Sequence, residues 1–206
     1  MKKKICILDY GLGNIYSLKN SIEKVGFKAY YFSEASDINY DLLFLPGVGS
    51  FSKAAKLLKK NNLSQIINNS NREKKGIIGI CLGMQILLKK GFEDGSNEGL
   101  NLIDGTVEKI KAKKEYKLPN IGWKNVFFKK NKDINYLDKF DSQKFYFVHS
   151  YEANLKDKKM IIGYSDFYEK KIASVIFKSN IIGFQFHPEK SGEIGLELLR
   201  ETIKYF

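Results

Sequence analysis

The chain has 206 residues, of which 43% are hydrophobic and 14% aromatic, and this suits one globular domain of ordinary size. The 35 Lys and Arg residues against 23 Asp and Glu residues give a formal net charge of +12. The apolar runs are shorter than the ~18 residues of a membrane span, and two cysteines are too few for a disulfide scaffold. The composition therefore favours a cytoplasmic protein with no membrane partner.

The excess of positive charge comes almost entirely from lysine. Only Arg72 and Arg200 are arginine, and the lysines are scattered in runs such as 53–60, 111–117 and 154–160. A nucleic-acid surface usually uses more arginine, because a guanidinium group binds phosphate with two hydrogen bonds. The scattered lysines favour solvated surfaces instead, so we expect no nucleic-acid partner.

Three lysines at the N-terminus precede a short apolar run, residues 5–8, and Asp9 follows directly. An export signal has a longer apolar segment. We therefore expect a first strand with a basic leader and no export signal.

Strand and helix signals alternate through the first half of the chain. The patterns predict strands at 3–10, 28–32, 40–49 and 75–80, and helices at 15–26, 50–70 and 82–91. Ser50 is suited to cap the second helix, and Gly26 and Gly91 are suited to end the first and third. The alternation implies right-handed crossovers and a mostly parallel central sheet that is covered by helices.

The second half of the chain has a different pattern. Strand-like runs are predicted at 105–113, 124–130, 143–153, 171–179 and 181–187, and a closing helix at 192–206. We expect these strands to extend the sheet and to add antiparallel strands. Because no repeat or linker interrupts the chain, a single α/β domain over residues 1–206 is predicted.

The stretch GIIGICLGMQILL, residues 76–88, places Cys81 between a predicted strand and a predicted helix. Gly79 and Gly83 flank it, and small neighbours permit the sharp turn of a nucleophile elbow. The start of a helix favours a thiolate, and the N–H of Leu82 would point towards an oxyanion. A structural, buried cysteine explains this local pattern equally well.

A cysteine nucleophile needs a base, and the chain has two histidines, His149 and His187. Pro188 disfavours helix at His187, so the chain is expected to be extended there. Residues two apart in an extended chain project to the same side, which allows the Glu189 carboxylate to orient the His187 ring. A packed histidine at a sheet end is the alternative.

A third element is the stretch LFLPGVGSF, residues 43–51, in which Pro46, Gly47 and Gly49 interrupt a buried strand. Glycines there allow backbone N–H groups to turn towards a developing oxyanion, and those of Val48 and Gly49 are the candidates. Taken alone, an ordinary strand-to-helix turn is the simpler interpretation.

Together these residues resemble the class I, or triad, glutamine amidotransferases, through GICLGMQ at 79–85 and HPE at 187–189. The resemblance covers essentially the whole chain and implies a flavodoxin-like, three-layer α/β fold. It also implies hydrolysis of L-glutamine to glutamate and ammonia through a thioester, without a cofactor. The implied triad is Cys81, His187 and Glu189, with an oxyanion site formed by Val48, Gly49 and Leu82.

Further motifs narrow the resemblance to the glutaminase subunits of imidazole glycerol phosphate synthases. In chain order they are DYGLGN at 9–14, PGVGSF at 46–51, GLNLIDGTV at 99–107, LPNIGW at 118–123, FYFVHSY at 145–151 and GFQFHPEKSG at 183–192. In that family the partner is a (β/α)8-barrel cyclase, and the resemblance therefore implies a heterodimer. The ammonia would enter histidine biosynthesis, giving imidazole glycerol phosphate and aminoimidazole carboxamide ribotide.

The same matching implies two further sets of residues. The positions that contact glutamine are Gly47, Gln85, Glu93, His149, Ser150 and Tyr151. The positions that meet the cyclase are Asn14, Asn120, Trp123 and Tyr146.

One position departs from the family pattern, since the family usually has PHxGW where this chain has PNIGW, with Asn120 in place of the histidine. Glutaminases that resemble this chain also supply ammonia in sugar pathways. Since Asn120 puts the identity of the partner in doubt, the alternative partner is an amidinating synthetase for a surface-polysaccharide or flagellar sugar. A cysteine peptidase would share the elbow but would not explain Gln85 or the HSY motif. The widely separated histidines and cysteines do not form a metal-ligand set, so no metal is expected.

Overall fold

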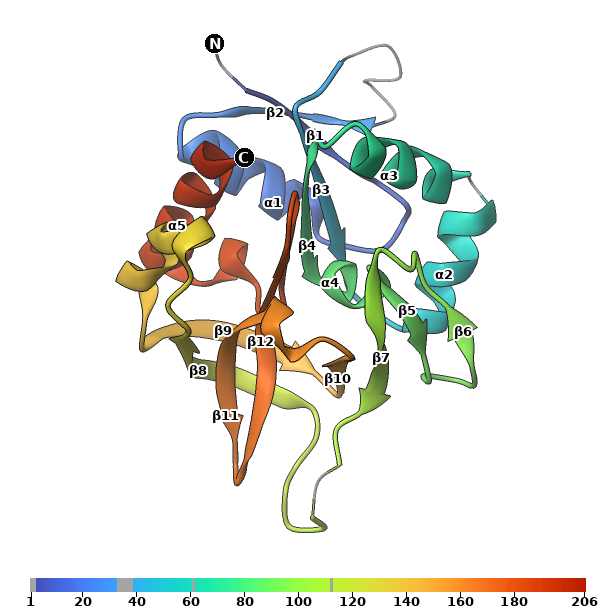
Figure 1. The fold of residues 1–206 in the computed structure, drawn as a ribbon, viewed down its shortest axis with the longest axis vertical. Coiled ribbons are helices and arrows are strands. Elements are labelled where there is room, and N and C mark those ends of the chain that lie inside the picture. The colour runs from blue at the N-terminus through green and yellow to red at the C-terminus, as the bar shows by residue number, and fades with distance from the viewer. Residues whose placement is uncertain (1–2, 33–38, 61, 112) are drawn as a thin grey trace.

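The computed structural model describes residues 3–32, 39–60, 62–111 and 113–206. In this part of the chain, nine strands form a central sheet in the order β2-β1-β3-β4-β13-β12-β11-β8-β9 (Figure 1). Four further strands form a smaller sheet. The predicted α/β class is confirmed as a mixed sheet, with helix-covered parallel strands and added antiparallel ones.

The parallel strands lie side by side in one half of the central sheet. They are β2 (Lys28–Tyr31), β1 (Lys4–Ile7), β3 (Leu42–Gly47), β4 (Gly76–Cys81) and β13 (Ile181–Phe184). Along β1, Ile5 and Ile7 belong to one apolar core, whereas Cys6 belongs to the core on the opposite face. Burial of both faces is the reason why these strands have continuous apolar runs in the sequence.

Helices cover both faces of these parallel strands. On one face lie α1 (Ile15–Lys24) and α5 (Gly192–Tyr205), which contact each other (Figure 1). On the other face lie α2 (Phe51–Lys60) and α3 (Leu63–Arg72). Leu18 and Ile22, about one turn apart on α1, are buried in the same core as Ile5.

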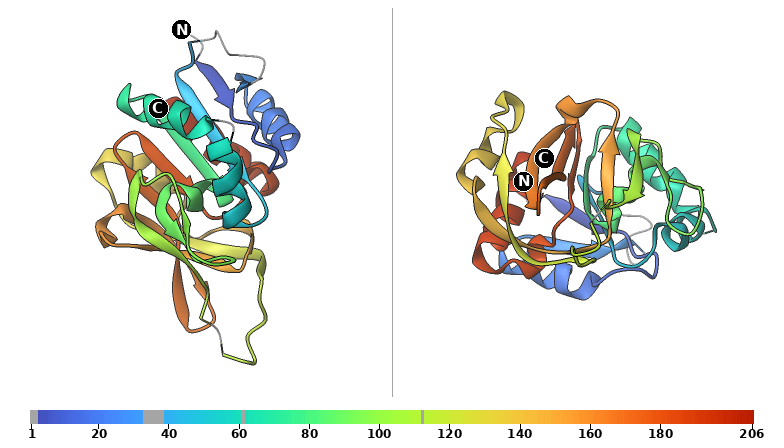
Figure 2. Two further views of the ribbon diagram at one scale, coloured as in Figure 1. Left: turned by 90° about the vertical axis from the view of Figure 1, so that its right-hand side faces the viewer. Right: turned by 90° about the horizontal axis from the view of Figure 1, so that it is seen from below.

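The other half of the central sheet is antiparallel. Its strands are β12 (Lys170–Lys178), β11 (Ile161–Phe167), β8 (Asn120–Phe128) and β9 (Gln143–His149). The β11–β12 hairpin projects from the same end of the molecule as residues 113–119 (Figures 1 and 2). Tyr116 stacks on Tyr168 at the hairpin turn, with 3.8 Å between the ring centroids.

The smaller sheet has the order β10-β7-β5-β6 and was not predicted. Its strands are β10 (Tyr151–Leu155), β7 (Ile103–Lys109), β5 (Leu88–Gly91) and β6 (Asn97–Glu98). The predicted helix at 82–91 is therefore wrong in its second half, because α4 (Leu82–Ile86) ends early. Leu88 pairs instead with Ile103, and this non-local ladder overrides the local helix propensity.

The predicted helix at 50–70 is also wrong, because it is two helices. Asn62 has a left-handed φ of 56°, a conformation that ends a helix and that asparagine adopts more readily than most residues. Likewise, the predicted strand at 143–153 is divided at Ser150, where the chain passes from the central sheet into the smaller one. This division places the HSY motif between the two sheets.

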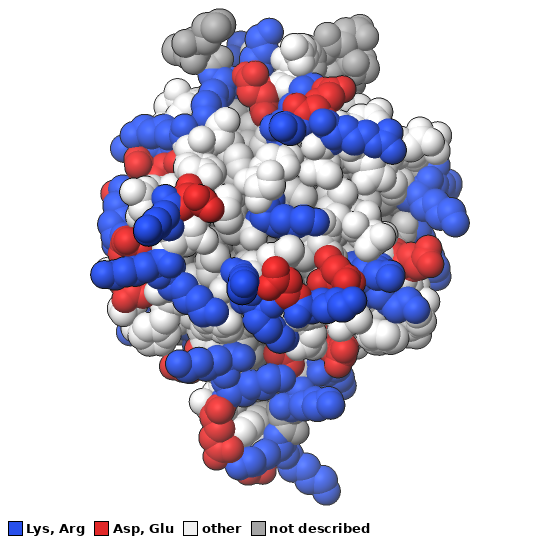
Figure 3. All heavy atoms as spheres, viewed as in Figure 1, with Lys and Arg blue, Asp and Glu red and all other residues white. Residues whose placement is uncertain are grey.

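Charged side chains are spread over the face of the molecule in Figure 3. Acidic groups lie among the lysines and arginines there, so the cations do not form one continuous patch on that face. No helix in the part of the chain that the structure describes is long and apolar enough to cross a membrane.

Candidate active site

Cys81 lies at the carboxyl end of β4, where the chain turns directly into α4. Its φ of 54° and ψ of −110° are unusual for a residue with a side chain, as the elbow interpretation requires. A Cβ atom at Gly83 would overlap the Leu45 carbonyl, and one at Gly79 would meet Met84 Cα at 2.8 Å. The two glycines therefore let α4 pack tightly against β3 and β4.

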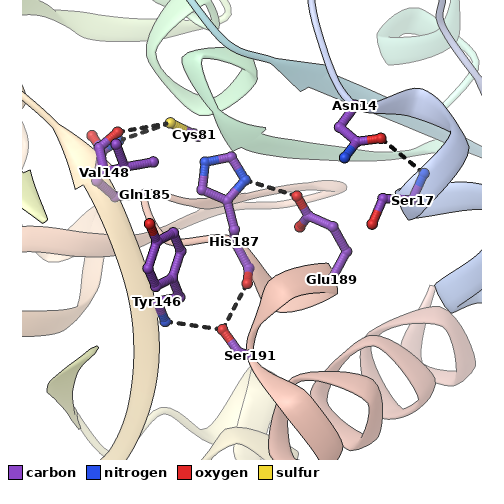
Figure 4. A network of polar contacts seen from close by, with 9 residues as sticks. All are labelled: Asn14, Ser17, Cys81, Tyr146, Val148, Gln185, His187, Glu189 and Ser191. Atoms are coloured by element: carbon purple, nitrogen blue, oxygen red, sulfur yellow. Dashed lines mark hydrogen bonds and ion pairs between the residues drawn. The ribbon is translucent and has the colours of Figure 1, made fainter. Parts of the chain in front are cut away.

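His187 and Glu189 lie next to each other beside Cys81 (Figure 4). His187 Nδ1 is 2.7 Å from Glu189 Oε1, and both side chains are buried. Because the carboxylate accepts, Nδ1 carries the proton. Nε2 is buried on the side of Cys81 and makes no hydrogen bond of ordinary geometry with the residues that the structure describes. Burial alone would lower the pKa of His187, but Cys81 and Glu189 outweigh it and raise that pKa to about 10. The arrangement therefore favours the protonated, imidazolium form of His187 between Cys81 and Glu189.

A cavity of about 440 Å³ opens beside Cys81. Its lining consists of Val48, Gly49, Ser50, Cys81, Leu82, Gln85, Glu93, Pro119, Val148, His149, Ser150 and Tyr151. The structure thus brings together most of the residues that the sequence assigns to oxyanion and substrate binding. Ser50, Pro119 and Val148 were not predicted, although each is adjacent in sequence to a predicted position.

Gly47 is the predicted substrate-binding residue that does not line the cavity. It ends β3 and pairs with Cys81 across the sheet, and it is buried. A Cβ atom there would overlap the Tyr10 hydroxyl and meet Leu82 Cβ at 3.0 Å. Gly47 therefore allows close packing beneath the elbow. Val48 and Gly49, which follow it, line the rim of the cavity, and Gly49 has a φ of 103°.

Glu93 lines the cavity from within the turn after β5. Its Oε2 accepts the N–H of Phe51 at 2.7 Å, at the start of α2. Burial raises the pKa of Glu93, the Phe51 N–H lowers it and neighbouring Asp94 raises it further. One oxygen of this carboxylate therefore holds α2 in place next to the rim residues.

His149 is a buried histidine that lines the cavity. Its Nδ1 is 2.8 Å from the Tyr151 carbonyl, which only an N–H can face, so the proton lies on Nδ1. Its Nε2 must then accept, and Asn120 Nδ2 lies 2.9 Å from it. Burial lowers the pKa of His149 to about 4, the Tyr151 carbonyl opposes this and His187 adds to it. His149 is thus held neutral beside the cavity.

The four residues predicted to meet a partner occupy different environments. Asn14 caps α1, with its side chain accepting the Ser17 N–H at 3.1 Å (Figure 4). Trp123 is 51% exposed and packs edge-to-face against Tyr146. The Asn120 side chain, in contrast, is buried against His149.

Sequence reasoning missed Gln185. It is fully buried, and its Nε2 lies 3.8 Å from Cys81 Sγ. The signal was available, since Gln185 stands two residues before His187 in an extended chain and therefore projects to the same side. Among the residues described, no group of three or more His, Cys, Asp or Glu side chains is placed to hold a metal ion.

The chain is similar to known proteins over nearly its whole length. The family model "Glutamine amidotransferase class-I" matches residues 6–204. The chain is 41% identical over 204 residues to the imidazole glycerol phosphate synthase subunit HisH of Lactococcus lactis subsp. lactis, covering 98% of each chain. It is 42% identical over 203 residues to the imidazole glycerol phosphate synthase subunit HisH 2 of Methanococcus maripaludis, covering 97% of this chain and 98% of the relative.

Solved structures share the fold at lower identity. A crystal structure of a glutamine amidotransferase superposes with a TM-score of 0.74 at 14% identity, over 98% of this chain and 97% of that one. The structure of PurLQS from Thermotoga maritima gives a TM-score of 0.73 at 20% identity, and the match covers 100% of this chain and 97% of that one. The family match and the full-length relatives together show that the chain belongs to the class-I glutamine amidotransferases.

Proposed function

We propose that this chain, as a single domain of residues 1–206, is the cytoplasmic glutaminase subunit of a two-subunit imidazole glycerol phosphate synthase. The observation that carries the proposal is the contiguous arrangement of Cys81, His187 and Glu189, with Cys81 lining a cavity of about 440 Å³. The names of the full-length relatives support the pathway. The partner would be a barrel cyclase that receives ammonia for histidine biosynthesis.

The proposed reaction begins when the Cys81 thiolate attacks the side-chain amide carbon of glutamine. The backbone N–H groups of Leu82, Val48 and Gly49 stabilise the oxyanion that forms. The His187 imidazolium gives its Nε2 proton to the amide nitrogen, and ammonia leaves as the thioester forms. His187 then removes a proton from water, which attacks the thioester and releases glutamate and the Cys81 thiolate.

The remaining cavity residues would orient the substrate. Glu93, Ser150 and Tyr151 line the cavity. The Glu93 carboxylate suits the ammonium group of glutamine, and Ser150 and Tyr151 would contact its other polar groups. Glutamine is held for attack only if its amide carbon reaches Cys81, so the contacts made by Glu93 determine orientation as well as affinity.

A Cys81→Ala variant tests the chemistry. It should abolish synthesis that depends on glutamine, by several orders of magnitude, while synthesis from added ammonia by the assembled enzyme continues. Retained glutamine hydrolysis in this variant would disprove the role of Cys81.

Co-expression tests the partner. A barrel cyclase should co-purify with the chain, with Asn14, Trp123 and Tyr146 as the expected contacts, and should stimulate glutamine hydrolysis. Stimulation by an amidinating sugar synthetase, with none by the cyclase, would keep the chemistry and replace the pathway. The sequence departure at Asn120 raises this second partner, although the Asn120 side chain itself is buried against His149.

A further inference from the structure

Gln185 is a buried polar side chain that the reaction above does not use. It follows β13 directly and is 0% exposed, and its backbone N–H is held by the Ser174 carbonyl at 2.9 Å. Its side chain lies on the same side of the chain as His187, and both reach towards Cys81 (Figure 4). Burying an amide is unfavourable unless its hydrogen bonds are made, so its partners are informative.

The orientation of the Gln185 amide follows from its neighbours. Gln85 Nε2 lies 3.1 Å from the Tyr151 carbonyl, and since that oxygen can only accept, the Gln85 NH2 group must face it. The second N–H of Gln85 is directed at Gln185, 3.0 Å from its Oε1. The oxygen of Gln185 therefore faces Gln85, and its NH2 group faces Cys81 Sγ at 3.8 Å.

The surroundings of the sulfur distinguish its two protonation states. In the thiol form, the S–H group can donate to the Val148 carbonyl, 3.9 Å away (Figure 4). A thiolate has no proton to donate, and the carbonyl then faces it with like charge. The donors available to a thiolate are the Gln185 amide and the Nε2 edge of His187.

We propose that Gln185 is a further catalytic residue, whose Nε2–H group donates a hydrogen bond to the Cys81 thiolate and stabilises it before attack. Gln85 is then a positioning residue, which fixes the Gln185 amide through a chain that begins at the Tyr151 carbonyl. The inference deepens the proposed function, because it assigns a second partner to the same nucleophile.

Two substitutions remove the donor in different ways. Gln185→Met has similar length and offers no N–H group, whereas Gln185→Glu keeps an oxygen for Gln85 and presents an oxygen to the sulfur. A hydrogen bond to a charged group is worth about tenfold or more in an equilibrium. The pH midpoint of thiolate reactivity should therefore rise by about one unit or more in both variants.

The rate at high pH gives a second signature. A thiolate that has lost a hydrogen bond is intrinsically more nucleophilic, by about threefold for each unit by which its midpoint rises. The plateau rate should thus increase by about threefold while the rate at neutral pH decreases. Mere loosening of the fold does not move the midpoint and the plateau in this linked manner.

The experiment follows the reaction of the full chain with 2,2′-dithiodipyridine from pH 5 to 10. Cys81 takes the mixed disulfide and pyridine-2-thione leaves. Cys6 is fully buried, and burial raises its pKa to about 12 against the opposing effect of Lys75, so it does not compete. Ser174→Ala is the matched control, since it removes a buried hydroxyl bond to Ser165 on the neighbouring strands without touching the sulfur.

His187 and Tyr10 are the other titratable groups whose charge is coupled to Cys81, and both are present in every variant. An unchanged midpoint in Gln185→Met and Gln185→Glu, with urea unfolding showing both folded, would overturn the proposal. An equal shift in Ser174→Ala would also overturn it. Because the assay needs neither glutamine nor a partner, its failure is distinguishable from failure of the glutaminase assignment.

Discussion

Replacing Glu189 by Gln removes the charge that faces His187 while keeping the size of the side chain. The bond from Nδ1 to Oε1 is 2.7 Å long, and the two side chains are only 2% and 5% exposed. A hydrogen bond between charged groups in such surroundings is worth about 1.5–3 kcal/mol. Since whole domains are stable by about 5–15 kcal/mol, the variant should remain folded.

The effect on activity should exceed the effect on stability. A glutamine side chain can present its NH2 group to Nδ1, and the ring would then carry its proton on Nε2 alone, where it cannot accept one from Cys81 or water. Loss of general acid–base function and of the correct tautomer costs about 10²–10⁴ in rate. We therefore expect glutamine hydrolysis to decrease by that factor in a chain that still unfolds cooperatively.

The pH dependence identifies the charge as the cause. The pKa of His187 is raised to about 10, above its unfolded value near 6.5, so its contribution to stability is complete below pH 6.5 and is lost as the pH rises towards 10. The destabilisation by Glu189→Gln should follow the same course. It should be largest near pH 6.5 and should approach zero at pH 10.

Urea unfolding at several pH values and a glutaminase assay measure both effects on one preparation. Glu193→Gln, an exposed carboxylate in the first turn of α5, is a control that should leave hydrolysis unchanged and lower the stability by no more than about 1 kcal/mol. Hydrolysis within about threefold of the original, or a destabilisation that is equal at pH 6.5 and pH 10, would refute the reasoning.

Three other substitutions follow from the packing. Tyr10→Phe should leave the free energy of unfolding, measured in urea, unchanged or raise it by up to about 1 kcal/mol, because the buried hydroxyl has no hydrogen-bond partner among the residues that the structure describes; a clear loss would contradict this. Gly83→Ala should lower it by about 1–3 kcal/mol and abolish hydrolysis, since its Cβ would overlap the Leu45 carbonyl; an active variant would show that the elbow can relax. Folded His149, with a pKa of about 4, does not take the proton that the unfolded chain takes below pH 6.5, so the protein should lose about 1.4 kcal/mol of stability per pH unit between pH 6.5 and 4. His149→Phe should remove this loss, and an identical slope in acid unfolding would exclude His149 as its source.

The elbow and its base could be predicted because each depends on local chemistry. The glycines two residues before and two residues after Cys81 indicate that α4 packs closely against the strands. The side-by-side placement of His187 and Glu189 follows from an extended chain that ends at Pro188. Gln185 obeys the same spacing and was predictable on the same grounds. Neutral side chains are easily passed over when only titratable residues are sought.

The smaller sheet could not be predicted, because its strands are defined by distant partners. Residues 88–91 have the composition of a helix end, and they form a strand only because β7, which begins at Ile103, lies beside them. The break at Ser150 is similar, since nothing in residues 143–153 shows that the chain changes sheets there. Both features adjoin the cavity, so its shape depends on non-local pairing even though its chemistry is readable in the motifs.

Asn120 replaces the histidine that the family usually has, and its place on β8 changes how this replacement is interpreted. Successive residues of a strand face opposite sides, and Ile121 and Trp123 are more than half exposed, whereas Asn120 is turned inward. Its amide donates to Nε2 of His149. Exchanging His for Asn there changes how a neutral His149 is held beside the glutamine cavity, and leaves the exposed apolar pair on β8 as it was. We therefore expect recognition of the enzyme that accepts the ammonia to depend on Ile121 and Trp123, and the family departure at Asn120 to bear on glutamine.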